Sequence, residues 1–416
     1  MKGVFVIIDG LGDMPCKELD GKTPLEAAET PNMDWLAKHG RQGLVYPVNE
    51  NYVPESDTAV VSLLGNNPFI SSRGVFEAIG SGIEINRGDL CLRTNFATIS
   101  GLPGKIIDRR AGRTLTRKES EVLAAEINKN VKLPCKFVFK PTVQHRGVLV
   151  LRGGLSDNIT NTDSAYQTKG KFFLKDEFNY SQAEDEEENT EYSANLVNEF
   201  IEQSYKILDK HPVNLERKRK GLLPANVILT RDAGIEIPKL KRHIGWVALA
   251  YMPLEIGIAK VSGMEICSFQ YPKMEGYDVY ENLYAGLNLA ISEARKCLAG
   301  NKEHSYFYIH FKETDVPGHD NKPLEKKAMI ETLDKKFFSF LRRFAEKNKI
   351  KIVITADHST PCKLKSHSSD PVPVLVFDPG KGGERDETLA FNEVQAKKGK
   401  LGKIYGKELL KKVGFV

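Results

Sequence analysis

The stretch Val4-Phe-Val-Ile-Ile8, followed directly by Asp9-Gly-Leu-Gly-Asp13, decides the fold class. A short, continuous apolar run is typical of a strand that is buried in a parallel sheet. After this loop, Thr30 and Gly40 are the expected caps of an amphipathic helix. The order strand, loop, helix therefore predicts an α/β protein with a mostly parallel sheet.

The same order returns near the C-terminus. The apolar run from Tyr306 to Phe311 is followed by a polar loop, a helical stretch from Pro323 to Lys347, and a second apolar run from Ile350 to Ile354. In open parallel sheets, ligands bind outside the carboxyl ends of the strands. We therefore expect helices on both faces of the sheet and a functional site at the strand ends.

The middle of the chain has a different pattern. Short alternating runs replace the long apolar ones, the acidic block Glu184 to Glu188 is expected to be a surface loop, and Glu216 to Lys220 a charged turn. The strongest candidate ligands lie on both sides of this region. We therefore predict a discontinuous metal-binding domain of residues 1–86 and 251–416, with a smaller α+β, substrate-binding domain of residues 87–250 inserted into it.

Composition excludes several classes of protein. The 416 residues are 41% hydrophobic and 28% charged, which is typical of a soluble globular protein, and a net charge of +5 is too small to indicate nucleic-acid binding. Six cysteines without a C-x-x-C pair favour a reducing compartment over a disulfide framework. With no signal peptide and no membrane-length apolar run, we expect a cytoplasmic protein that contacts neither membrane nor nucleic acid.

Carboxylates and imidazoles recur where the predicted strands end. Taken singly, each histidine is more often a satisfied polar residue than a ligand. Together, the residues supply two sets of oxygen and nitrogen donors, as two divalent cations roughly 4 Å apart require. These candidate metal ligands are Asp9, Asp315, His319, Asp357, His358 and His367.

Ser56-Asp57-Thr58 precedes the apolar stretch Ala59 to Leu64, which reads as the start of a helix. The usual role of a hydroxyl in this position is to cap the helix. The alternative is a nucleophile, because a neighbouring cation would lower the pKa of the hydroxyl and the helix amides would face an incoming phosphate.

Basic residues of the middle region form a third group. Asp108-Arg-Arg-Ala-Gly-Arg113 places three arginines in six residues, and Arg146 and Arg231 flank strand-like runs. Arginine forks bind phosphate and carboxylate oxygens in pairs. The alternative is a salt-bridged surface, which we favour for Arg110 and Arg152. Lys260 lies alone in a small apolar segment and fits either a phosphate-binding charge or a surface lysine.

These motifs, in this order, resemble the archaeal-type 2,3-bisphosphoglycerate-independent phosphoglycerate mutases, members of the alkaline phosphatase superfamily. The resemblance extends from the first strand to the last motif. It is carried by Asp9-Gly-Leu-Gly-Asp13, Thr23-Pro-Leu-Glu26, Ser56-Asp-Thr-Ala59, Arg73-Gly74, Asp108-Arg-Arg-Ala-Gly-Arg113, Thr230-Arg-Asp-Ala-Gly234, Lys312-Glu-Thr-Asp315, Gly318-His319, Ala356-Asp-His-Ser359 and Ser366-His367.

The resemblance implies an alkaline-phosphatase-like fold and an isomerase of glycolysis and gluconeogenesis. Its members interconvert 3-phosphoglycerate and 2-phosphoglycerate through a phosphoserine, here Ser56, without 2,3-bisphosphoglycerate. They use two divalent ions, with Mn²⁺ or Mg²⁺ expected first and Co²⁺ or Zn²⁺ next.

The resemblance also assigns roles to the candidate residues. It implies one ion on Asp315, His319 and His367 and the other on Asp9, Asp357, His358 and the Ser56 oxygen. Asp108 and Lys260 match catalytic residues of the family, and Arg109, Arg146 and Arg231 match residues that bind phosphoglycerate.

Other functions fit the metal residues alone. A phosphatase, a phosphopentomutase or a sulfatase of the same superfamily would need the same ligands, and a non-catalytic sensor of phosphorylated ligands would keep the fold. The arginine cluster and the large insert favour the mutase, because a hydrolase need not retain its alcohol. The oligomeric state and the native metal stay open.

Overall fold

The computed structural model describes residues 1–166, 176–273, 278–301, 303–380 and 385–415. Within them the larger unit contains a sheet of eight strands, in the order β13-β2-β12-β11-β1-β10-β8-β9. Neighbouring strands are parallel except at the pairs β11–β12 and β12–β2. The strands are β1 (Gly3–Ile8), β2 (Arg41–Tyr46), β8 (Trp246–Leu249), β9 (Glu265–Cys267), β10 (Tyr306–Phe311), β11 (Lys351–Thr355), β12 (Val372–Phe377) and β13 (Gly402–Tyr405).

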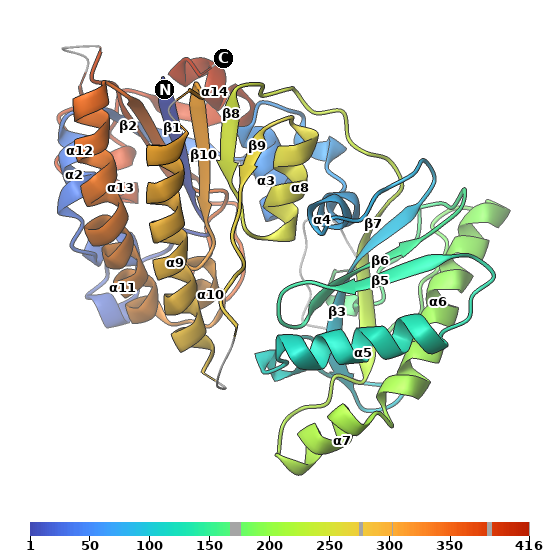
Figure 1. The fold of residues 1–416 in the computed structure, drawn as a ribbon. Helices are drawn as coiled ribbons and strands as arrows, with labels where there is room; N and C mark the ends of the chain where they lie inside the picture. The colour runs from blue at the N-terminus through green and yellow to red at the C-terminus, as the bar shows by residue number, and fades with distance from the viewer. Residues whose placement is uncertain (167–175, 274–277, 302, 381–384, 416) are drawn as a thin grey trace.

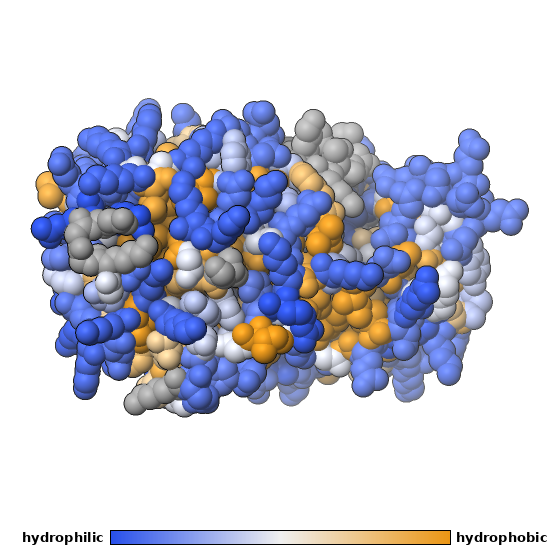
Figure 2. Space-filling model, turned by 90° about the horizontal axis from the view of Figure 1, so that it is seen from above, coloured by the Kyte–Doolittle hydropathy of each residue, from blue (hydrophilic) through white to orange (hydrophobic). Residues whose placement is uncertain are grey.

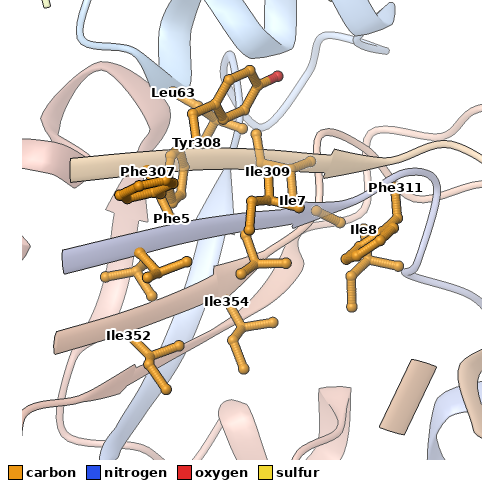
Figure 3. Close-up of a cluster of buried hydrophobic side chains, with 14 of the residues drawn as sticks. Phe5, Ile7, Ile8, Leu63, Phe307, Tyr308, Ile309, Phe311, Ile352 and Ile354 are labelled. Atoms are coloured by element: carbon orange, nitrogen blue, oxygen red, sulfur yellow. The ribbon is translucent and has the colours of Figure 1, made fainter. Parts of the chain in front are cut away.

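The predicted apolar runs form the centre of this sheet. β1 is buried along its whole length and lies between β10 and β11, with Val6 opposite Ile309 on one side and Ile354 on the other. Aromatic and β-branched side chains of the three strands fill the layers above and below the sheet (Figure 3). Because all three strands run in the same direction, their carboxyl ends meet at one edge.

Helices cover both faces of the large sheet (Figure 1). On one face, α2 contacts α12, α9 contacts α11, and the π-helical turn Asp334–Phe338 contacts all four helices; on the other face, α3 contacts α8. This arrangement confirms the predicted fold class. The α-helices of the chain are α1 (Pro24–Ala27), α2 (Pro31–Lys38), α3 (Ser56–Leu63), α4 (Arg73–Gly80), α5 (Arg117–Asn130), α6 (Glu188–Leu208), α7 (Pro212–Arg219), α8 (Pro253–Val261), α9 (Val279–Gly300), α10 (Asp315–His319), α11 (Pro323–Leu333), α12 (Ser339–Asn348), α13 (Glu393–Ala396) and α14 (Leu409–Val413).

The smaller unit has an antiparallel sheet and a hydrophobic core of its own. Its central strand β3 pairs with β4, β6 and β7, and β5 pairs with β6. Helices α5, α6 and α7 belong to this unit (Figure 1). Its strands are β3 (Leu90–Ile99), β4 (Ile106–Asp108), β5 (Phe137–Pro141), β6 (Arg146–Leu151) and β7 (Val227–Gly234).

Helix α4 connects the two units. It packs against β3 of the smaller unit and against α8 of the larger one. The two helices approach so closely that a Cβ atom on Gly257 would lie 1.9 Å from the carbonyl oxygen of Phe76. The chain returns to the large sheet at β8. Residues 246–249 of this strand belong to the large sheet, although they lie just before residue 250, the predicted end of the insert. The division at residues 86 and 250 stays a prediction.

Two local predictions have different outcomes. The acidic block Glu184 to Glu188 is exposed; residues 184–187 lie in the loop before α6, as expected, and Glu188 is the first residue of that helix. The segment Glu216 to Lys220 is not a turn before a strand, because α7 includes residues 212–219 and begins with a proline. The Arg217 side chain of this helix is buried and pairs with Glu119, so a tertiary contact stabilises a charged helix that the sequence pattern did not indicate.

The surface fits the composition. Hydrophilic side chains cover most of the face in Figure 2, and apolar side chains appear in smaller areas. Among the residues described, we find no helix that is both long and apolar enough to cross a bilayer.

Candidate active site

Three carboxylates converge at the edge where the central strands end. Asp9 follows β1, Asp357 follows β11 and Asp315 begins α10 shortly after β10. Because β11, β1 and β10 are neighbours in the sheet, residues far apart in the sequence come together here. The loop that follows β11 adds His358 and His367 to the same place, and the first residue of α3 adds Ser56.

The first ligand set predicted from the sequence is assembled around Asp315. Its Oδ2 lies 3.3 Å from Nε2 of His319, one helical turn on, and its Oδ1 lies 3.8 Å from Nε2 of His367. The two imidazole rings lie 5.1 Å apart, centroid to centroid. One carboxylate and two imidazoles therefore face a common point.

The second set is assembled around His358. Its Nε2 lies 3.3 Å from Oδ1 of Asp9, 3.3 Å from Oδ2 of Asp357 and 3.2 Å from Oγ of Ser56. The ring of His358 also stacks on that of His367 at 3.6 Å. The two sets are therefore in direct contact, as a pair of adjacent cations requires.

All three imidazoles are oriented in the same way. Their Nδ1 atoms are hydrogen-bonded to oxygen atoms, namely backbone carbonyls for His319 (3.0 Å) and His367 (2.9 Å) and the hydroxyl of Thr360 for His358 (3.0 Å). This leaves each Nε2 to face the carboxylates. Metal-binding histidines are held by such a bond on the second ring nitrogen.

Ser56 is the first residue of α3 and is not its cap. Glu55 is the N-cap residue, and Ser56 makes no capping bond; its buried hydroxyl points at His358 instead. The first-turn hydroxyl of Thr58 differs, because it donates to the carbonyl of Glu55 at 3.0 Å. Of the two hydroxyls, only that of Ser56 faces the carboxylate–imidazole cluster.

The electrostatics of this cluster favour a cation. Burial, together with the charge of Asp357, raises the pKa of Asp9 well above its usual range. Burial and the nearby charge of Lys312 lower the pKa of His358 to about 3, so this imidazole is neutral near pH 7. Oδ1 of Asp9 and Oδ2 of Asp357 are buried and accept no hydrogen bond. Unpaired buried carboxylate oxygens beside neutral imidazoles are the donors that a divalent cation binds.

A group of arginines lies next to this cluster. Arg73 of α4 contacts Glu55 and Glu77 at 3.1 Å, and Arg93 of β3 lies 3.2 Å from Glu77. Arg231 of β7 is opposite Arg93 in the sheet. Burial and the like charges of Arg231 and Arg73 lower the pKa of Arg93 to about 9. An anion bound here would relieve this repulsion.

The predicted arginines Arg146 and Arg231 belong to this group. Both lie on strands next to β3, and their charges act on Arg93. The guanidinium of Arg231 also lies 3.8 Å above the ring of Tyr166, which fixes its plane.

Asp108 and Arg109 are engaged within the smaller unit. Oδ1 of Asp108 accepts backbone N–H bonds from Arg110 (2.7 Å) and Gly112 (2.9 Å). Arg109 donates to Asp163 at 2.8 Å and also pairs with a second aspartate. These contacts hold the arginine-rich loop in a defined shape.

Arg113 of the same loop contacts the larger unit. Its Nη1 donates to both carboxylate oxygens of Asp320, at 2.8 and 2.9 Å. Asp320 directly follows His319, so the arginine-rich loop of the smaller unit is bonded beside the first ligand set.

Lys260 lies elsewhere. It is exposed in the last turn of α8, whereas the first turn of that helix lies near the cluster through Glu255. The lysine placed among the site carboxylates is Lys312, whose side chain is 15% exposed and whose ammonium contacts Asp9 and lies 2.8 Å from Glu255.

Comparison with known proteins assigns the family. The family model described as 2,3-bisphosphoglycerate-independent phosphoglycerate mutase matches residues 37–214. A protein of that name from Thermococcus kodakarensis is 38% identical over 416 residues, which cover 98% of this chain and 95% of the relative. The chain belongs to the 2,3-bisphosphoglycerate-independent phosphoglycerate mutase family. A second protein of the same name, from Pyrococcus furiosus, is 39% identical over 420 residues, which cover 98% of this chain and 95% of that relative.

Solved structures agree with this mutase family. The chain resembles a protein from Pyrococcus horikoshii with a TM-score of 0.75 and 29% identity, covering 100% of this chain and 98% of the other. It also resembles the cofactor-independent phosphoglycerate mutase of Thermoplasma acidophilum, with a TM-score of 0.59, 29% identity and coverages of 100% and 99%. The resemblance noted from the sequence motifs is thereby confirmed.

Several residues at the site of this mutase-family chain were not predicted from the sequence. His310 lies within a strand-like apolar run, and Lys312 was quoted only as part of a motif. Arg73 was likewise quoted only as part of a motif. Glu255 and Arg93 each stand alone in an apolar run, and this isolated charge was the signal that the sequence offered.

Proposed function

We propose that this chain interconverts 3-phosphoglycerate and 2-phosphoglycerate without 2,3-bisphosphoglycerate, and that Ser56 carries the phosphoryl group between the two half-reactions. The observation that supports this most strongly is the position of the Ser56 hydroxyl. It makes no helix cap, lies 3.2 Å from His358, and stands next to Glu55, which Arg73 binds.

The donors around Ser56 fit two divalent cations. We assign one cation to Asp315, His319 and His367, and the other to Asp9, Asp357, His358 and the Ser56 oxygen. A mixed set of carboxylates and imidazoles suits Mn²⁺, Co²⁺ or Zn²⁺, and Mg²⁺ in the oxygen-rich part. When bound, such cations lower the pKa of a coordinated hydroxyl and neutralise charge on a phosphoryl group.

The residues of the chain supply the remaining steps. The Ser56 oxygen attacks phosphorus, a bond from Oγ to phosphorus forms, and the bond from phosphorus to the C3 oxygen of glycerate breaks. Glycerate then turns within the site, and its C2 oxygen attacks the phosphoserine and restores Ser56. The same steps in reverse convert 2-phosphoglycerate.

The smaller unit would hold glycerate between these steps. Arg146 and Arg231, with Arg109 at the edge of the loop, are placed to bind the carboxylate and phosphate oxygens. Asp108 would move a proton between the two glycerate hydroxyls. We assign the role of the active-site lysine to Lys312 and not to the exposed Lys260. Closure of the two units would keep water from the phosphoserine.

The test compares Ser56→Ala with Thr58→Ala in an assay that couples 2-phosphoglycerate formation to enolase. Chelator-treated wild-type protein is assayed with no addition, with Mn²⁺ or with Mg²⁺, always without bisphosphoglycerate. We expect activity only with metal, none in Ser56→Ala, and near wild-type activity in Thr58→Ala, whose hydroxyl is already bonded to the backbone.

Two outcomes would overturn the proposal. Turnover by Ser56→Ala at the wild-type rate would exclude Ser56 as the nucleophile. Release of inorganic phosphate from 3-phosphoglycerate, with no 2-phosphoglycerate formed, would identify a phosphatase of the same superfamily instead of a mutase.

A further inference from the structure

His310 is a fourth imidazole at the site that neither the sequence motifs nor the family comparison assigns. It lies near the end of β10 and is buried. Its Nε2 lies 3.6 Å from Oδ2 of Asp9 and 3.6 Å from Oδ2 of Asp357. We propose that His310 is a further ligand of the cation that Asp9 and Asp357 hold, an inference that rests on the two-cation function proposed above.

The orientation of His310 matches that of the three predicted ligands. Its Nδ1 is hydrogen-bonded to the hydroxyl of Tyr308 at 2.9 Å, and its Nε2 faces carboxylates. A metal-binding histidine has the same arrangement, because the bond on Nδ1 fixes the ring and leaves the Nε2 lone pair for the ion. His243, which is also buried, differs: its Nε2 is bonded to the carbonyl of Leu64 at 3.0 Å.

The distances from Nε2 of His310 to the two carboxylate oxygens are typical of atoms that bind the same metal ion and not of hydrogen-bond partners. A distance of 3.6 Å is too long for a hydrogen bond between nitrogen and oxygen, and Nε2 of His310 has no hydrogen-bond partner. Nitrogen and oxygen ligands lie about 2.0–2.2 Å from such an ion, which places neighbouring ligand atoms of a five-ligand site roughly 3.0–3.6 Å from each other. Nε2 of His310 is equally distant from both carboxylates, as a shared ion would require.

The strand geometry explains how this histidine reaches the ligands. Side chains of a strand alternate between its two faces, so His310 shares a face with Tyr308, while Ile309 and Phe311 belong to the other face. His310 is opposite Ile7 of β1, two residues before Asp9. An imidazole in an otherwise apolar, buried strand loses hydration, and binding a cation would compensate for that loss.

The alternative is that His310 is a structural donor, with its Nε2–H turned toward the carboxylates. Cobalt binding separates the two roles, because the visible absorption of bound Co²⁺ reports its ligands directly. We would titrate metal-free wild-type protein, His310→Asn and the matched buried-histidine control His243→Asn with Co²⁺, and record calorimetric affinities and spectra alongside circular dichroism.

We expect two Co²⁺ equivalents in each protein. In His310→Asn one equivalent should bind at least tenfold more weakly, with a changed visible spectrum, whereas His243→Asn should match the wild type. Unchanged affinity and spectrum in His310→Asn would overturn the proposal. So would a third equivalent in the wild type that His310→Asn loses entirely, because this would indicate a separate cation site.

A measurement on the wild type keeps the test valid if His310→Asn does not fold. Protein with ¹⁵N-labelled histidine is loaded with ¹¹³Cd²⁺, and the Nε2 resonances with a one-bond coupling to cadmium are counted. We expect four, from His310, His319, His358 and His367; three, with His310 uncoupled, would refute this inference alone. Wild-type protein that binds no divalent cation would refute the two-cation function as well.

Discussion

Replacing Arg113 by methionine tests whether the two units must close over the substrate. Arg113 makes two hydrogen bonds to Asp320, beside His319, and both side chains are about one-fifth exposed. Two unit charges at about 4 Å attract each other by roughly 4 kcal/mol at an effective dielectric constant of 20. After desolvation and side-chain ordering are subtracted, about 1–2 kcal/mol should remain for such a two-pronged pair.

If closure accompanies substrate binding, the closed state loses that amount in Arg113→Met. A loss of about 1–2 kcal/mol corresponds to a rise of roughly 5- to 30-fold in KM for phosphoglycerate. A more open site also admits water to the phosphoserine, so phosphate release should increase relative to mutase turnover. The aliphatic stem is retained by methionine, and Tyr280 still donates to Asp320 at 2.9 Å, so the fold should be preserved.

The assay is the enolase-coupled rate at several substrate concentrations, with phosphate release measured in parallel. Arg219→Met is the matched control, because the exposed Arg219 pairs with Glu216 within α7, away from the larger unit. The double variant with Asp320→Asn completes a mutant cycle and isolates the pair. Wild-type KM and wild-type phosphate release in Arg113→Met would refute closure through this ion pair.

Three further predictions follow from the packing and charges. Gly257→Ala should lower the free energy of unfolding by about 2 kcal/mol, because the new Cβ would lie 1.9 Å from a backbone carbonyl oxygen of α4. This loss is expected despite the gain of about 1 kcal/mol in helix propensity. Thermal melts measure the change, with Gly300→Ala as the control, because nothing lies within 4 Å of a Cβ at that position. Arg93→Met should raise KM at least tenfold without lowering the melting temperature, because the variant loses one guanidinium of the anion site and also the repulsion by Arg231 and Arg73 that lowers the pKa of Arg93 to about 9. A large loss of stability with normal KM would contradict this. In metal-free protein, burial lowers the pKa of His358 to about 3, so below about pH 6.5 the unfolded chain binds more protons at this residue and its contribution to stability should fall as the pH drops, by up to about 1.4 kcal/mol per pH unit. Buried carboxylates with a raised pKa, such as Asp9, contribute with the opposite sign, so the test compares denaturant melts of the wild type with those of His358→Gln between about pH 6.5 and 4. The same pH dependence in both proteins would exclude a neutral, buried imidazole at this position.

Sequence alone could predict the residues that directly follow apolar runs. Asp9, Asp315 and Asp357 each stand in a loop after a strand, and parallel strands bring such loops to one edge. The metal-ligand sets predicted from these positions lie within contact distance in the structure. Which of these side chains contact one another depends on the register of the neighbouring strands, and the sequence alone does not reveal that register.

The remaining site residues could not be predicted for a physical reason. His310 and Arg93 lie inside strands, where the apolar pattern that identifies the strand also conceals a functional side chain. The buried contacts of Arg217, which stabilise α7, depend on residues about 100 positions earlier. Similarly, Cys16 and Cys362 appear scattered in the sequence but lie within 4.8 Å of each other and of Asp13.

The position of Ser56 between two oppositely charged clusters limits what the site can bind. On one side, unpaired carboxylate oxygens of Asp9 and Asp357 favour cations; on the other, crowded guanidinium groups favour anions. Glu55 links them, because it pairs with Arg73 at 3.1 Å and lies 3.8 Å from Nδ1 of His367. A phosphoryl ester satisfies both sides at once, since its oxygens bind metal cations and arginines alike. A neutral substrate would leave the repulsion among the arginines in place, so the arrangement favours a phosphorylated acid over an uncharged alcohol.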